Sequence, residues 1–136
     1  MAKLVPELYC SSFAHSLRFY VELLGFHILY DRPEERFAYL DREGAQLMIE
    51  QPTGRTWLTG ELSHPFGRGI NLQIGASDVD RLYAKCRVEE LPIFLPLEEK
   101  SYRRNGTFLR CRQFIVQDPD GYLLRFQQTL GMKASA

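Results

Sequence analysis

The sequence lacks the features that mark several protein classes. Its three cysteines, Cys10, Cys86 and Cys111, form no CxxC pair, so a structural metal cluster is not expected. No apolar run approaches the roughly 20 residues that span a bilayer, and the first residues do not have the pattern of a signal peptide. Neither charge sign prevails, with 17 basic and 17 acidic residues. We therefore expect a cytoplasmic protein with free thiols and with neither nucleic acid nor membrane as a partner.

Sequence motifs of common catalytic machinery are also missing. The chain has no GxSxG, no P-loop and no dinucleotide fingerprint. None of the cysteines has a neighbouring histidine in the sequence, and no two histidines have a familiar metal-ligand spacing. We therefore assign no catalytic residue, no metal ligand and no cofactor from motifs.

An internal repeat is the most informative feature that is present. RFAYLDREGAQLMIEQ (36–51) aligns without a gap on QFIVQDPDGYLLRFQQ (113–128). Asp41 then falls on Asp118 and Gly44 on Gly121, as expected for two hairpins with equivalent turns. An extended run and an amphipathic helix precede each copy, which predicts two copies of one unit.

The predicted fold class is α+β, with each unit built as strand–helix–strand–strand–strand. The helix of the first unit has an apolar stripe from Phe13 to Leu24 and ends at Gly25. The boundaries that we predict are a first unit at 3–51, a linker loop at 52–68, a second unit at 69–128 and a frayed tail at 129–136. The polar and basic segment 98–107 is expected to be a loop.

Alternation along four predicted strands separates a greasy face from a polar face. The greasy faces are expected under the helices, and the polar faces are expected to line a cleft or to face water. The residues predicted to bind a ligand on this basis are Glu7, Tyr9, Met48, Glu50, Asn71, Gln73, Arg125 and Gln127. Phe37, Tyr39, Arg112 and Phe114 are further candidates, although alternation does not fix the face of their strands.

The linker and the 98–107 segment hold residues with two interpretations each. Trp57 either stacks on an aromatic ligand or covers a core or an interface. His64 is either solvated or titrates near neutral pH. Tyr102, Arg103 and Arg104 form either a mobile lid or a solvated loop.

Three segments carry a family resemblance: SLRFYVELLGF (16–26), GAQLMIEQ (44–51) and DPDGYLLRF (118–126). They resemble the vicinal oxygen chelate superfamily, which includes glyoxalase I, extradiol dioxygenases, and fosfomycin- and bleomycin-resistance proteins. The resemblance covers nearly the whole chain. It implies two tandem βαβββ units, each curled into an incomplete barrel with its helix on the outer face, and a homodimer.

Metal-dependent members of that superfamily bind a divalent ion through the first and last strands of each unit. The matching positions here are Val5, then Met48 or Glu50, then Asn71 and Arg125. Valine has no ligand atom, and arginine is a fixed cation. The last predicted strand, in which Arg125 follows Leu123 and Leu124, resembles that of the bleomycin-resistance branch, and this resemblance implies sequestration of a drug in a cleft at the dimer interface.

The resulting hypothesis is a metal-free protein that sequesters an antibiotic or a toxic metabolite. Because Glu7 and Glu50 are offset by Arg125, a zwitterionic, amphipathic or acidic aromatic ligand suits the charges as well as a cationic drug does. The alternatives are a glyoxalase- or dioxygenase-like enzyme with an atypical or absent metal site, and a scaffold without a ligand.

Overall fold

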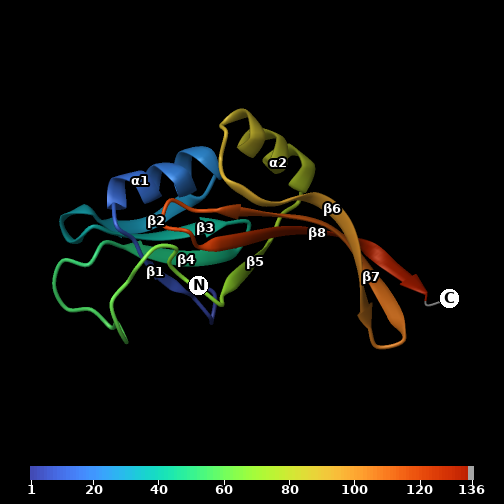
Figure 1. Ribbon diagram of the computed structural model, residues 1–136, viewed down its shortest axis with the longest axis horizontal. Coiled ribbons are helices and arrows are strands. Elements are labelled where there is room, and N and C mark those ends of the chain that lie inside the picture. The colour runs from blue at the N-terminus through green and yellow to red at the C-terminus, as the bar shows by residue number, and fades with distance from the viewer. Residues whose placement is uncertain (135–136) are drawn as a thin grey trace. The chain divides into compact units, whose positions relative to one another are not determined.

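A computed structural model of the protein describes residues 1–134 and shows two four-stranded sheets with helices, an α+β fold without a closed barrel (Figure 1). Two βαβββ units are present, as the repeat predicts. The elements in chain order are β1 (Glu7–Tyr9), α1 (Phe13–Leu17), η1 (Arg18–Leu23), β2 (His27–Arg32), η2 (Pro33–Glu35), β3 (Phe37–Arg42), β4 (Ala45–Glu50), β5 (Asn71–Gly75), α2 (Val79–Val88), β6 (Ile93–Arg104), β7 (Thr107–Gln117) and β8 (Leu123–Ala134).

The first sheet has the strand order β1-β4-β3-β2, with β1 parallel to β4 and the other pairs antiparallel. The α1–η1 helix begins after Ser12, whose side chain accepts a hydrogen bond from the His15 amide. It ends before Gly25, which adopts a φ of 82° as predicted for the glycine after a helix. The buried core of this sheet and helix includes Leu8, Tyr20, Leu24, Phe26, Leu40, Leu47 and Ile49.

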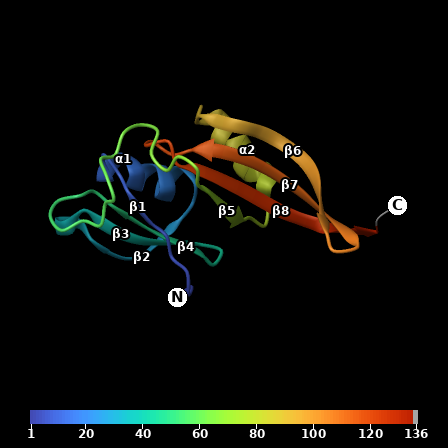
Figure 2. The same ribbon diagram turned by 60° about the horizontal axis from the view of Figure 1, so that its bottom comes forward.

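The second sheet repeats the pattern with the order β5-β8-β7-β6, and its three long strands β6, β7 and β8 run side by side (Figure 2). Asp78 caps α2 by accepting the Arg81 amide hydrogen bond at 3.1 Å. The buried core here includes Ile74, Val79, Leu82, Cys86, Phe114, Val116, Leu124 and Phe126.

Two stretches differ from the sequence prediction because they pair with β7. The expected loop at 98–107 is the second half of β6 and the turn into β7, where Asn105 has a φ of 56°. Asn-Gly at 105–106 is the strongest short hairpin signal, and the prediction missed it. The expected tail at 129–136 continues β8 to Ala134, and residues 135–136 lie outside the described chain.

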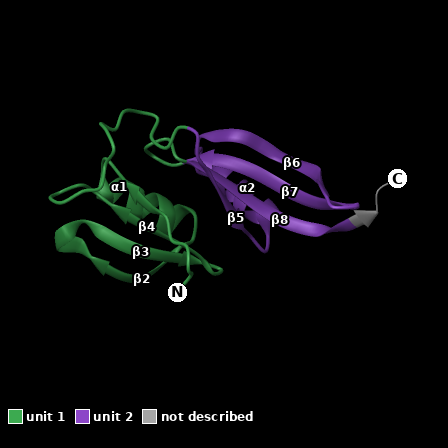
Figure 3. Cartoon of the chain, turned by 90° about the horizontal axis from the view of Figure 1, so that it is seen from below, with its two compact units in different colours: residues 1–68, 118–122 green, residues 69–117, 123–136 purple. Residues whose placement is uncertain are grey.

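The chain divides into two compact units whose boundary differs from a simple cut at the linker (Figure 3). Unit 1 comprises residues 1–68 and 118–122, and unit 2 comprises the described parts of 69–117 and 123–136. The turn between β7 and β8 therefore belongs to unit 1. The linker predicted at 52–68 also belongs to unit 1.

Candidate functional site

In unit 1, the strand register collects the predicted polar residues on one face of the sheet. Glu7 on β1 is opposite Met48 on β4, which is opposite Tyr39 on β3. In the next row, Tyr9 is opposite Glu50, which is opposite Phe37. Facing positions on one sheet side lie roughly 5 Å apart. The polar faces of β1 and β4 were thus predicted correctly, and Phe37 and Tyr39 join them.

Aromatic rings form much of this face. Tyr30 on the edge strand β2 stacks on Tyr39, with 5.0 Å between ring centroids. The hydroxyl of Tyr39 donates a 2.6 Å hydrogen bond to Oε1 of Gln46, and burial raises the pKa of Tyr39. The guanidinium of Arg32 lies 4.1 Å from the ring centroid of Phe37, within cation–π range. Phe37 and Tyr39 are themselves buried, so the accessible part of this aromatic group is Tyr30, with the cation of Arg32 beside it.

Glu7 and Glu50 are the carboxylates of this face, and both are half-buried. Burial raises the pKa of Glu50, and the nearby negative charge of Glu7 raises it further. The positive charge of Arg32 acts in the opposite direction on the same pKa. A carboxyl group whose ionised form is disfavoured in this way is suited to holding a proton or a hydrogen-bond donor from a ligand.

The loop at 52–68 is tied to the same face through Tyr9. The hydroxyl of Tyr9 accepts a 3.0 Å hydrogen bond from the backbone amide of Trp57. The indole itself is 71% exposed, so the alternative in which Trp57 covers a core is wrong. Arg55 lies 5.1 Å from its ring centroid. The backbone of Trp57 is thus hydrogen-bonded to Tyr9 on the polar face, and the indole ring is exposed.

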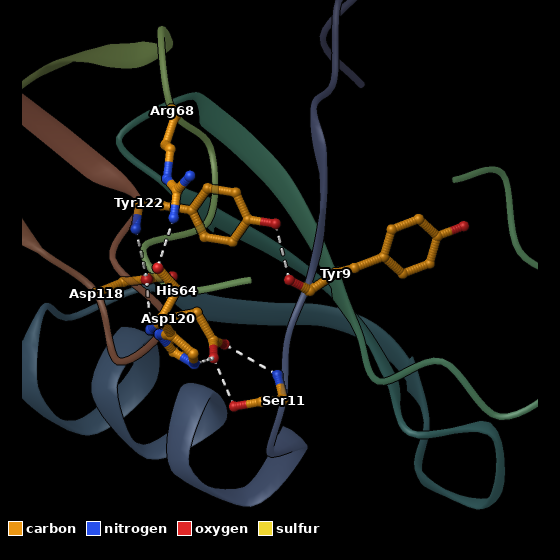
Figure 4. Close-up of polar contacts among 7 residues, drawn as sticks. All are labelled: Tyr9, Ser11, His64, Arg68, Asp118, Asp120 and Tyr122. Atoms are coloured by element: carbon orange, nitrogen blue, oxygen red, sulfur yellow. Dashed lines mark hydrogen bonds and ion pairs between the residues drawn. The ribbon is translucent and has the colours of Figure 1, made fainter. Parts of the chain in front are cut away.

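A buried polar cluster fixes the backbone at the end of β1 (Figure 4). Asp120 is fully buried and accepts hydrogen bonds from both the amide and the hydroxyl of Ser11. The hydroxyl of Tyr122 donates a 2.8 Å hydrogen bond to the carbonyl of Tyr9. Nε2 of His64 lies 3.4 Å from Oδ1 of Asp120, while 58% of the His64 side chain is exposed, in agreement with the interpretation of a solvated histidine.

Asp118, at the start of the same turn, accepts three hydrogen bonds through its side chain. Its carboxylate accepts hydrogen bonds from the Tyr20 hydroxyl and from the amides of Asp120 and Tyr122. Burial raises the pKa of Asp118 even though these bonds act to lower it. Burial also raises the pKa of the nearby Cys10 thiol to about 11, which leaves that thiol unreactive near neutral pH. This cluster positions the backbone of Tyr9 through Tyr122.

In unit 2, Asn71, Gln73, Arg125 and Gln127 lie on the sheet face away from α2. Gln73 is opposite Arg125 across β5 and β8. Nε of Arg125 donates a 3.1 Å hydrogen bond to Oδ1 of Asn71. Gln113, which the sequence prediction missed, joins them because it is opposite Gln127. In the sequence, Gln113 is a polar residue directly before the apolar run 114–116, but alternation could not assign the face on which its side chain lies.

Arg112 and Phe114 do not belong to this polar face. Arg112 donates hydrogen bonds of 2.8 and 3.0 Å to Asp80 on α2. Phe114 is fully buried against Phe126 and the α2 residue Tyr83. Both side chains therefore lie on the helix side of the sheet, and their expected place beside the other candidates is corrected. The reason is the register, which places Phe114 opposite Phe126.

The residues at the family's metal positions do not fit a metal ion. In the described part of the chain, no three His, Cys, Asp or Glu side chains cluster closely enough to hold one. At the unit 2 positions, the amide oxygen of Asn71 is already paired with the guanidinium of Arg125. A fixed cation that occupies the one available oxygen ligand opposes binding of a second cation there. None of the helices among the described residues has the length and apolar character required to cross a membrane.

Comparison with known proteins identifies one superfamily, both by its family model and by a solved structure. The model of the Glyoxalase/Bleomycin resistance protein/Dioxygenase superfamily matches residues 4–126. A member of that superfamily from Vibrio splendidus 12B01 is 39% identical, over 93% of this chain and 97% of that chain, with a TM-score of 0.44. No match was found among the curated proteins.

Two more distant structures are similar in fold. TioX from Micromonospora sp. ML1 is 23% identical over 95% of this chain and 100% of that chain, with a TM-score of 0.69. A lactoylglutathione lyase from Agrobacterium tumefaciens is 14% identical over 94% of each chain, with a TM-score of 0.57. At these identities, the similarity concerns the fold alone.

Proposed function

Because the chain belongs to the Glyoxalase/Bleomycin resistance protein/Dioxygenase superfamily, we propose that it is a metal-free small-molecule binding protein of that superfamily. The observation that carries this proposal is the pairing of Arg125 with Asn71 at two positions where metal-dependent relatives would place ligands. A guanidinium and an amide bind polar organic groups well and divalent ions poorly.

The binding surface in this proposal is the polar face of each sheet, described unit by unit above. Unit 1 contributes Glu7, Glu50, Tyr9 and Met48 with the rings of Phe37 and Tyr39. Unit 2 contributes Asn71, Gln73, Arg125 and Gln127. Convergent hydrogen-bonding groups beside apolar side chains fix the orientation of small organic molecules in their sites. Sequestration of an antibiotic or a toxic metabolite, without turnover, is the biological role that we propose.

Elemental analysis tests the metal-free part of the proposal. Protein purified without added metal is expected to contain well below one equivalent of Ni, Zn, Mn or Fe per chain. The free protein is then incubated with each of these ions and dialysed, and the content is expected to stay low. Stoichiometric retention of any of them would overturn the proposal in favour of a metal enzyme.

A thermal-shift screen tests ligand binding. The screen includes bleomycin-type drugs, fosfomycin and aromatic acids, because a ligand that binds only the folded protein raises its melting temperature. For any compound that binds, Arg125→Ala is expected to weaken the affinity by about 1–3 kcal/mol, the scale of a lost charge-assisted hydrogen bond. Arg18→Ala, which removes an exposed arginine on η1, is the matched control. An unchanged affinity in Arg125→Ala would remove this residue from the site, and a broad screen without a hit would favour a scaffold.

A second candidate function rests on the raised pKa of Glu50. A carboxylate that binds protons more tightly than usual is a better general base when it is ionised. This candidate is proton transfer without a metal, on a substrate held beside Glu50 on the polar face of unit 1. It requires that a compound found in the screen be converted by the protein, and that Glu50→Gln abolish the conversion while binding persists.

A further inference from the structure

The polar face of unit 2 holds a cluster of polar side chains that includes two residues not predicted from the sequence, Glu98 and Gln113. The register sets Glu98 on β6 opposite Gln113 on β7, and Gln113 opposite Gln127 on β8. Arg125 lies two residues from Gln127 on the same face of β8. Diagonal neighbours on a sheet face lie about 7–8 Å apart, so one small molecule spans Gln113 and Arg125.

The side-chain carbonyl oxygen of Gln113 has no hydrogen-bond partner among the described residues. The side chain is 3% exposed, and Nε2 donates hydrogen bonds to Oε1 of Glu98 at 2.9 Å and to the hydroxyl of Tyr102 at 2.6 Å. Among the described residues, nothing donates a hydrogen bond to Oε1 of Gln113. Flipping the amide would not help, because Oε1 would then face a carboxylate oxygen of Glu98. Buried acceptors are nearly always paired, so this oxygen marks a place for a donor from outside the chain.

Arg125 supplies the opposite kind of group. Its Nε is bonded to Asn71, while within the described chain its two terminal nitrogens have neither a hydrogen bond nor an ion pair. Its positive charge lowers the pKa of the buried Cys111 thiol, against the larger effect of burial. Since Cys111 lies two residues from Gln113 on β7, the guanidinium charge reaches this cluster. A planar guanidinium whose two terminal nitrogens are available as donors is suited to binding a carboxylate.

We propose that this face binds a ligand with a carboxylate close to an N–H donor, as in an N-acylated amino acid. The carboxylate pairs with the terminal nitrogens of Arg125, and the N–H donates to Oε1 of Gln113. Glu98 favours the donor end of the ligand at Gln113, because a second carboxylate there would be repelled. Tyr102 is half-buried on the edge strand β6 and is the neighbour whose side chain moves to admit the donor. This proposal rests on the proposed function and names the chemical class for unit 2.

Isothermal titration of the full chain with three probes tests the proposal. Hippurate has both groups, N-methylhippurate lacks the N–H, and hippuramide lacks the charge. Hippurate is expected to bind at least about tenfold more tightly than either analogue, the usual effect of one hydrogen bond to a buried or charged partner. Absence of hippurate binding, or equal affinity for the three probes, would overturn the proposal.

Variants assign each preference to its residue. Arg125→Gln is expected to weaken hippurate binding by about tenfold to a hundredfold and to abolish its advantage over hippuramide. Gln113→Leu is expected to abolish only the advantage over N-methylhippurate. Arg110→Gln is the control, because Arg110 is on β7 but pairs with Glu99. If a variant does not fold, the comparison of the three probes on the unaltered protein still decides.

The outcome separates this proposal from the proposed function. If a compound from the thermal-shift screen binds in an Arg125-dependent way while hippurate does not, the ligand class is wrong and the proposed function stands. If neither hippurate nor any screened compound binds, both are overturned.

Discussion

Glu50 illustrates how a single residue on the proposed binding face is held at a cost in stability. Its carboxyl is half-buried beside Glu7, and both effects raise its pKa. A raised pKa means that the folded protein prefers the protonated form. The stability that this group contributes is therefore present below its unfolded pKa of about 4.3 and is lost as the pH rises through the folded value.

Glu50→Gln is therefore expected to stabilise the protein at pH 7, by up to about 1 kcal/mol for a partly exposed charge. The gain comes from removal of the buried negative charge beside Glu7. At pH 4 the gain is expected to shrink, because the wild-type carboxyl is then largely protonated. Urea unfolding at both pH values measures the difference in the free energy of unfolding.

The exposed Glu61 in the 52–68 loop provides the control for this experiment. Glu61→Gln is expected to change the free energy of unfolding little at either pH. A Glu50→Gln variant that is less stable than wild type at pH 7 would contradict the inference that the ionised form of Glu50 is disfavoured in the folded protein.

At the scale of elements, the two repeated hairpins end in turns with different surroundings. Gly44 and Gly121 occupy equivalent repeat positions and have φ values of 89° and 99°. A Cβ on Gly44 would meet nothing within 4 Å, whereas a Cβ on Gly121 would lie 2.5 Å from Cβ and 2.9 Å from Cα of Pro65. The second turn is thus packed against the linker loop within unit 1, and the first turn is open.

These two glycines make a matched pair of tests. Gly44→Ala is expected to cost about 1–2 kcal/mol, from the positive φ alone. Gly121→Ala is expected to cost a further 1–3 kcal/mol or so, because the backbone at Pro65 cannot easily move. Denaturant unfolding of both variants measures the difference, and equal destabilisation would show that the contact with Pro65 carries no weight.

The face on which each strand carries its polar side chains was predicted correctly where the alternation of polar and apolar residues was unambiguous. In β1, β4, β5 and β8, one side of the alternation is apolar and the other polar, so the faces follow from the sequence. In β7 both sides mix polar and apolar residues: Arg112, Phe114 and Val116 alternate with Gln113 and Ile115. Only pairing with β8 showed that Phe114 packs on the core and that Gln113 belongs to the polar face. For the same reason, the face of Arg112 could not be predicted.

At the scale of the whole molecule, each sheet in the described part of the chain ends in strands that pair on one side only. The first sheet ends in β1 and β2, and the second ends in β5 and β6. On β2, the side chains of Ile28, Leu29 and Tyr30 are 39%, 49% and 40% exposed. Exposed apolar edge strands favour association with another chain, and closed two-fold dimers are the commonest form.

We therefore predict a homodimer, with a mass twice 15.8 kDa in light scattering after gel filtration. Its melting temperature is expected to rise with protein concentration, because dissociation accompanies unfolding. A monomer mass together with a melting temperature independent of concentration would contradict the prediction.

The sequence by itself determined the repeat, the α+β class, the turns at Gly44 and Gly121 and the composition of four polar faces, because these depend on local spacing and alternation. The tertiary structure alone decided which faces of β7 and β6 are inward, that 98–107 and 129–134 extend a sheet, and that Asp118 to Tyr122 anchor Tyr9. The physical reason is that strand pairing and the contacts of buried polar groups such as Asp120 and Tyr122 involve partners up to 113 positions away in the chain, and no local pattern records them.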